Sequence, residues 1–147
     1  MLFTIGHGAA PFYDLLRRLQ EHGVRMVLDV RSQPYSGRAP HYNKRELEAE
    51  LIAAGIAYRW LGDRLGGKPL QPGGLVPIED DNLLSAGITD AAALAGGATS
   101  SLLCAELDPT HCHRTVALAP RFEEKGFRVV HILDDGELRT HQPTLGL

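Results

Sequence analysis

The sequence predicts an α/β protein: a three-layer α/β/α sandwich built on a mostly parallel sheet of about five strands. Three observations favour this class. Short apolar runs recur along the 147 residues, segments of helical length separate them, and Gly or Pro marks most boundaries. Several of the runs are apolar on both faces, as in strands buried within a parallel sheet. We expect one domain over residues 1–147.

Five segments have the apolar or alternating pattern of strands. They cover residues 2–5, 24–30, 56–61, 101–105 and 128–133. After the last of them, Asp134-Asp135-Gly136 reads as a turn that could add a small C-terminal hairpin. Since helical segments separate the strands, we expect parallel pairing with helices on both sides of the sheet.

Two helices are predicted in the first half of the chain. Pro11 opens the first helix and Gly23 closes it. Asn43 precedes the second helix, and Glu46 follows three residues later, which is a capping-box-like pair. Each helix connects two of the predicted strands.

The second half is less regular. Residues 62–82 are rich in Gly and Pro and are expected to form an irregular loop, which in a small domain usually has a function. A short helix is expected over residues 91–94. A longer helix should begin with Asp108 as N-cap and run toward Lys125, with a kink at Pro120.

Composition and charge exclude several classes of protein. Two cysteines argue against a disulfide scaffold. No apolar run approaches the ~18 residues of a membrane helix, and the first residues do not resemble a signal peptide. We therefore expect a soluble cytoplasmic protein with reduced cysteines and no membrane partner, whose oligomeric state stays open. A net charge of −3 excludes a uniformly basic nucleic-acid coat.

The charge is unevenly distributed. Residues 1–70 carry ten Lys or Arg and seven Asp or Glu, a net +3, whereas residues 71–147 carry five and eleven, a net −6. Positions 30–45 hold no acidic residue, and Pro and Gly there predict an irregular loop. This loop is either a solvated basic turn or a clamp for an anion. Its basic residues are Arg31, Arg38, His41, Lys44 and Arg45.

Polar residues follow the predicted strands at their carboxyl ends. They are His7, Asp29 with Arg31, Glu106 and Asp134. In parallel sheets these ends meet at one edge, where ligands bind. The sequence therefore predicts a ligand site at the carboxyl edge.

Asp29 and Arg31 lie on the same face of an extended strand, because side chains alternate with period two. They can form an ion pair, which either holds Arg31 as a bidentate clamp for phosphate or carboxylate or simply anchors the loop. His7, between two glycines, is either an acid/base group or a hydrogen-bonded structural residue.

A second cluster follows the fourth strand. Cys112 is expected in the first turn of its helix, where the helix dipole, His113 and Arg114 would lower the thiol pKa. Cys112 is then a nucleophile, although its spacing also fits the buried face of the helix. Cys104 is expected in the core. A transition-metal site using Cys, His and Glu is a further alternative, although the cysteine spacing is not a zinc signature.

Several strings in this order resemble a known family. They are Thr4-Ile5-Gly6-His7, Asp29-Val30-Arg31-Ser32 with Pro34 and Ser36, Pro40-His41-Tyr42-Asn43, Leu65-Gly66-Gly67, Cys104-Ala105-Glu106 followed by Cys112-His113-Arg114, and His131-Ile132. The sequence resembles the bacterial and archaeal family called domain of unknown function 488. The resemblance implies an α/β domain whose motif residues lie mostly at the carboxyl edge of the sheet. The family has no established reaction. The motif residues are His7, Asp29, Arg31, Ser36, Arg38, Asn43, Glu106, Cys112, His113 and Arg114.

The chain departs from the family pattern in three places. Gly8 stands where the family commonly has Ser, and Gly37 stands where Arg is frequent. Residues 70–100 look shorter and less aromatic than the family's middle segment. The first two changes remove a hydroxyl and a cation from the expected site, and the third alters a segment that could cover it.

The leading hypothesis is a protein that binds an anionic ligand at the carboxyl edge, phosphate-containing and derived from a nucleotide or nucleic-acid end, and that could catalyse its transfer or hydrolysis. In this hypothesis Arg31, Arg38 and Arg114 hold phosphate. His7 or His113 is the acid/base group, and Cys112 or Glu106 the nucleophile or its orienter. The alternatives are a binding module without turnover and a transition-metal protein. Whether the protein is an enzyme, and which cofactor it uses, stay open.

Overall fold

The computed structural model describes residues 1–66, 68–70, 74–76 and 81–141. Its main sheet has six strands in the order β3-β2-β6-β1-β7-β8. Every pairing in the sheet is parallel except that of β8 with β7. The fold class predicted from the sequence is confirmed, and the C-terminal hairpin is present. The strands are β1 (Leu2–Gly6), β2 (Met26–Asp29), β3 (Ala57–Trp60), β6 (Ser100–Cys104), β7 (Val129–Ile132) and β8 (Leu138–Thr140).

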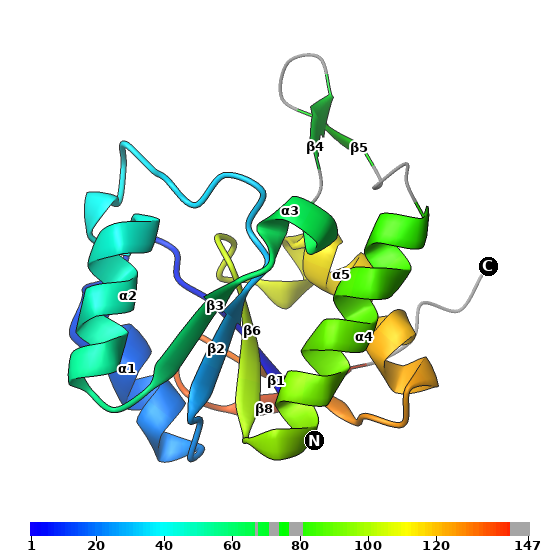
Figure 1. Ribbon diagram of the computed structural model, residues 1–147. Helices are drawn as coiled ribbons and strands as arrows, with labels where there is room; N and C mark the ends of the chain where they lie inside the picture. The colour runs from blue at the N-terminus through cyan, green and yellow to red at the C-terminus, as the bar shows by residue number, and fades with distance from the viewer. Residues whose placement is uncertain (67, 71–73, 77–80, 142–147) are drawn as a thin grey trace.

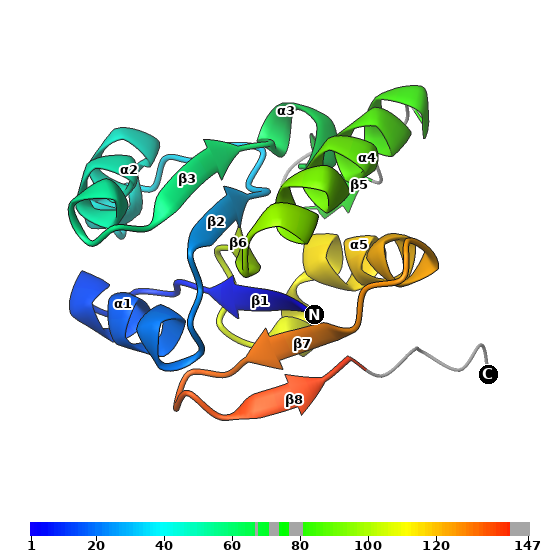
Figure 2. The ribbon, with the colours of Figure 1, turned by 60° about the horizontal axis from the view of Figure 1, so that its bottom comes forward.

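Helices cover both faces of the sheet. Helices α1 and α2 lie on one face, and α4 and α5 lie on the other (Figures 1 and 2). The short helix α3 and the hairpin of β4 and β5 follow β3 along the chain. The bounds are α1 (Phe12–Glu21), α2 (Lys44–Ala53), α3 (Gly62–Leu65), β4 (Lys68–Leu70), β5 (Gly74–Val76), α4 (Asp81–Gly97) and α5 (His113–Glu124).

Each face of the sheet packs on its own apolar core. On β1, Phe3 and Ile5 belong to the core that also contains Leu15 and Leu19 of α1. Leu2 belongs to the opposite core, with residues of α4 and α5. This division follows from the period-two alternation of side chains along a strand. It explains why strands with two buried faces read as continuous apolar runs.

Two regular elements lie where the sequence predicted an irregular loop. Residues 62–65 form α3, and the hairpin of β4 and β5 follows. The predicted short helix at residues 91–94 is part of α4, which starts at Asp81. Gly87 lies inside α4 against α3, and a Cβ there would come within 2.7 Å of Leu65 Cδ2. Gly87 thus permits close packing of α4 against α3.

The expected helix from Asp108 to Lys125 is divided. Pro109–His111 form a short 3₁₀ helix, capped by the Asp108 side chain, which accepts from the Thr110 N–H at 2.9 Å. Cys112 is extended, and α5 begins only at the next residue. The placement of Cys112 in the first turn of the helix is therefore wrong. Pro120 does lie inside α5.

The capping box predicted at the start of α2 is absent. Asn43 is the N-cap residue, but its side chain makes no cap hydrogen bond. Its Oδ1 atom accepts instead from the backbone N–H of Ser36 at 2.6 Å. The side-chain oxygen closes a loop and is not available to the helix. No helix in the described part of the chain is both long and apolar enough to span a membrane.

Candidate functional site

A buried ion pair lies at the carboxyl end of β2. The Arg31 guanidinium donates from Nε to Asp29 Oδ1 at 2.9 Å and from Nη2 to Asp29 Oδ2 at 2.7 Å. The Arg31 backbone N–H also donates to Oδ1, and the Tyr58 hydroxyl donates to Oδ2 at 2.5 Å. The side chains of Arg31 and Asp29 are 3% and 0% exposed. The ion pair inferred from the strand alternation is confirmed.

His7 extends this network to the end of β1. Arg31 Nη1 lies 3.3 Å from His7 Nε2 and also donates to the Tyr42 carbonyl at 2.8 Å. Because a guanidinium only donates, Nε2 must accept. The proton then sits on Nδ1, which lies 2.6 Å from the Gly8 carbonyl. Both nitrogens of the neutral imidazole are thus engaged.

Burial controls the charges of this network. Desolvation lowers the pKa of His7 from 6.5 to about 4, with the Arg31 charge acting in the same direction, so the imidazole is neutral at neutral pH. Burial alone would lower the pKa of Arg31, but the hydrogen bonds and charge of Asp29 outweigh it and raise that pKa. Burial and the Asp29 charge together raise the pKa of Tyr58 above its usual range. The network is one cation and one anion held among neutral groups.

Tyr42 connects the loops that follow β1 and β2. Its ring stacks on the His7 imidazole with centroids 4.4 Å apart, and its hydroxyl donates to the Ala10 carbonyl at 2.6 Å. Burial raises the pKa of the Tyr42 hydroxyl to about 12, so it stays a donor. Neither Tyr42 nor Tyr58 is among the site residues predicted from the sequence. For Tyr58 the only signal is alternation along β3, because its contact with Asp29 depends on the pairing of β2 with β3.

At two glycines of this edge, the backbones of neighbouring segments lie unusually close together. A Cβ at Gly6 would come within 1.7 Å of the Glu106 carbonyl oxygen, and one at Gly62 within 1.9 Å of the Arg31 carbonyl oxygen. The Arg31 carbonyl also accepts from Trp60 Nε1 at 2.8 Å. Only glycine fits at positions 6 and 62 without displacement of a neighbouring strand's loop.

The basic loop between β2 and α2 is closed by its own polar residues. Besides the Ser36–Asn43 hydrogen bond, the Ala39 N–H donates to Ser36 Oγ at 3.1 Å and the Lys44 N–H donates to the Pro34 carbonyl at 2.8 Å. Ser36 and Asn43 therefore shape the loop. The loop rises above the carboxyl edge beside the start of α2 (Figure 1).

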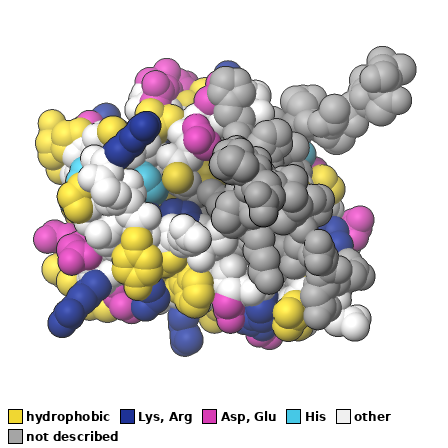
Figure 3. Space-filling model, turned by 90° about the horizontal axis from the view of Figure 1, so that it is seen from above, with side chains coloured by type: hydrophobic (Ala, Val, Ile, Leu, Met, Phe, Trp, Pro, Cys, Tyr) yellow, Lys and Arg dark blue, Asp and Glu magenta, His cyan; other side chains and the backbone are white. Residues whose placement is uncertain are grey.

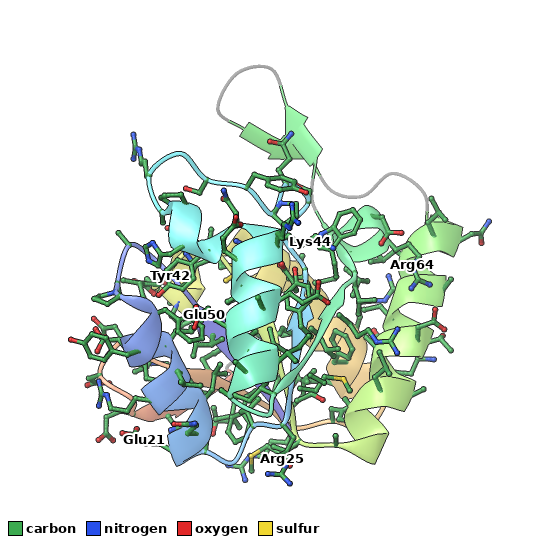
Figure 4. All side chains as sticks on the ribbon, turned by 60° about the vertical axis from the view of Figure 1, so that its left-hand side comes forward. Glu21, Arg25, Tyr42, Lys44, Glu50 and Arg64 are labelled. Carbon is green, nitrogen blue, oxygen red and sulfur yellow. The ribbon has the colours of Figure 1, made fainter. Side chains whose placement is uncertain are left out.

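Two cations of this loop face solvent. Arg38 and Arg45 are exposed, and Lys44 is half-buried. Figure 4 places Lys44 at the upper end of α2, on the opposite side of the fold from Arg25. Seen from above, Lys or Arg and His side chains lie among hydrophobic, acidic and other side chains over the part of this edge nearest α1 and α2 (Figure 3).

The residues after β6 lie beside the end of β1 but make no side-chain contact with the Asp29–Arg31 ion pair among the described hydrogen bonds. The His7 N–H donates to the Cys104 carbonyl at 3.0 Å, which ties the two strand ends together. Glu106 is exposed, and Cys112 is buried with 1% of its surface exposed. The side chains of His113 and Arg114 lie outside the described part of the structure. The network thus brings together His7, Asp29 and Arg31, while Cys112 sits at the junction before α5.

A cavity of about 200 Å³ opens between the loop after β6 and the ends of β7 and β8. Its lining shares no residue with the His7–Arg31–Asp29 network. Among residues 1–66, 68–70, 74–76 and 81–141, no group of three or more His, Cys, Asp or Glu side chains is placed to hold a metal ion. The cavity is lined by Leu107, Asp108, Pro109, Leu133, Asp134 and Arg139.

Comparison with known families adds one finding. Residues 10–72 match the model of DUF488, a domain of unknown function. The match confirms the family resemblance, and it covers the segment that holds Asp29, Arg31, the basic loop and Tyr58. No curated protein and no solved structure gives a significant match to the chain. The family description names no activity.

Proposed function

We propose that the protein binds an anionic, phosphate-containing ligand at the carboxyl edge of the sheet, on the basic loop of residues 30–45. The observation that carries this proposal is the charge of that loop. It holds basic residues and no acidic one, in a chain whose net charge is −3. A local excess of cations at the ligand-binding edge of a parallel sheet favours an anion there.

In this proposal the side chains of Arg38 and Lys44 bind the phosphate. Arg31 is buried, and its Nε and both Nη atoms already donate to Asp29, Tyr42 and His7. Its role in the proposal is therefore to position the loop. Arg38 is exposed on the loop and Lys44 stands half-buried at the start of α2, and both side chains carry charged donors of the kind that bind phosphate oxygens. Arg114 remains a predicted third contact.

Binding without turnover is the form of this function that the geometry supports best. A general base needs a lone pair that can reach the substrate. At His7, Nε2 accepts from Arg31 and Nδ1 faces the Gly8 carbonyl. Cys112 is buried, so attack by its thiolate on a ligand at the edge would need the loop before α5 to move. Catalysis by Glu106, Cys112 or His113 stays a prediction.

The test measures the dissociation constant of inorganic pyrophosphate by titration calorimetry. We expect Arg38→Ala and Lys44→Ala each to weaken binding by about tenfold, since each removes one charge-assisted hydrogen bond. Arg25→Ala is the matched control, because Arg25 is exposed at the opposite edge of the sheet (Figure 4). Equal affinities in all four proteins, or no binding at all, would show that the loop is not an anion site.

A further inference from the structure

Tyr35 is an exposed aromatic residue on the same loop. Its side chain is 66% exposed, between Pro34 and Ser36. A single exposed aromatic residue is ordinary on a protein surface. What distinguishes Tyr35 is the way in which its backbone is held.

Both neighbours of Tyr35 are tied to the start of α2. The Pro34 carbonyl accepts from the Lys44 N–H at 2.8 Å, and the Ser36 N–H donates to Asn43 Oδ1 at 2.6 Å. The Ser36 hydroxyl in turn accepts from the Ala39 N–H. The backbone on each side of Tyr35 is therefore fixed while its ring stays in solvent. An aromatic ring presented in this way loses little conformational entropy when a ligand stacks on it.

Two cations follow Tyr35 on the same loop. Arg38 is three residues away and exposed, and Lys44 is hydrogen-bonded through its backbone to the residue before Tyr35. An aromatic face with cations beside it is the arrangement that binds unpaired nucleotides, because the base stacks on the ring and the phosphate meets the cations. A ligand without a base, such as a sugar phosphate, would leave the ring unused.

We propose that Tyr35 is the stacking platform for a nucleobase whose phosphate is held by Arg38 and Lys44. The ligand is then a nucleotide, either free or at the end of a single strand. This inference rests on the proposed function, because it needs the anion site on the basic loop. It adds the residue that selects for a base.

The experiment compares two ligands that differ only in the base: adenosine 5′-monophosphate and ribose 5-phosphate. Wild-type protein should bind the nucleotide about tenfold more tightly, which is the contribution of one stacked base. Tyr35→Ala should remove this preference and leave the dissociation constant of ribose 5-phosphate unchanged. Tyr35→Phe should keep the preference, because stacking needs the ring and not the hydroxyl.

Tyr13→Ala is the matched control, since Tyr13 is equally exposed, at 68%, on α1. Unchanged thermal unfolding of each variant shows that the fold is intact. A third ligand, single-stranded dA5, separates the two sources of a nucleotide: tighter binding of dA5 than of the monophosphate indicates a strand end, and equal or weaker binding a free nucleotide. Either result supports the proposal if Tyr35→Ala weakens the binding.

Two outcomes are contrary and can be told apart. If both ligands bind equally to the wild type, or if Tyr35→Ala leaves the ratio of their affinities unchanged, base stacking on Tyr35 is wrong while the anion site stands. If neither phosphate compound binds and pyrophosphate does not bind either, the proposed function itself fails, and the inference fails with it.

Discussion

Asp29 is the residue on which the buried network depends. Its carboxylate accepts from the Arg31 side chain, the Arg31 backbone and the Tyr58 hydroxyl. It is the only anion in the network, so it compensates the Arg31 charge in a place that water does not reach. The sequence predicted this pair from the spacing of two residues along one strand. It could not predict Tyr58 or Tyr42, whose contacts join residues that are 29 and 11 positions away from their partners.

We expect Asp29→Asn to lower the free energy of unfolding by roughly 3–5 kcal/mol, because it leaves Arg31 buried without a counter-charge. Urea denaturation measures the loss. Tyr58→Phe is the comparison: it removes one hydrogen bond to the same carboxylate and should cost about 1.5–3 kcal/mol. An Asp29→Asn protein as stable as Tyr58→Phe would mean that the charge of the pair contributes little.

At the scale of elements, two junctions show why local patterns were partly misleading. Residues 62–82 look irregular because of their Gly and Pro content, but Gly62 serves packing, since it admits the loop after β2. Asn43 has the chemistry of a helix cap, but its side chain closes the loop at Ser36. In each case a residue type that usually ends or caps a helix is used for a contact with another element, which a local pattern does not contain.

Gly62→Ala should destabilise the protein by roughly 1–3 kcal/mol, because the new Cβ would overlap the Arg31 carbonyl and push the loop after β2 outward. Thermal unfolding checks the stability. Gly37→Ala is the matched control, since a Cβ at Gly37 meets nothing within 4 Å. The same pair of variants should differ in pyrophosphate affinity, with only Gly62→Ala weakened. Equal stability of the two variants would contradict the close approach.

At the scale of the whole molecule, neutral histidines are buried on both faces of the sheet. His131 lies on the face opposite to His7, with Thr4 Oγ1 at 2.6 Å from its Nδ1 and His141 Nδ1 at 3.1 Å from its Nε2. Burial, with His141 and then Arg139 adding to it, lowers the pKa of His131 from 6.5 to about 4. Both histidines therefore favour folding only while they are uncharged.

Stability should fall as the pH drops from about 6.5 to about 4. In that window the unfolded chain binds protons at His7 and His131 while the folded protein does not, because both folded pKa values are lowered. The loss is up to roughly 3 kcal/mol for each histidine. Unfolding free energies across this range check the slope. His131→Gln should reduce the slope, whereas Thr4→Val, which keeps the histidine, should not. A slope that His131→Gln leaves unchanged would contradict the assignment.

Local regularities in the sequence are enough to predict the α/β class, the edge of the sheet where polar residues gather, and the pairing of Asp29 with Arg31. These follow from short-range regularities: strand alternation, helical spacing and the shared direction of parallel strands. The position of β6 between β1 and β2, and the contact of Tyr58 with Asp29, follow instead from the packing of the folded chain. The same packing places His7 and the Tyr42 carbonyl against the Arg31 guanidinium, while the side chains of Arg38 and Tyr35 face solvent. The physical reason is that strand order and register depend on the packing of distant segments, and no local pattern in the chain encodes them.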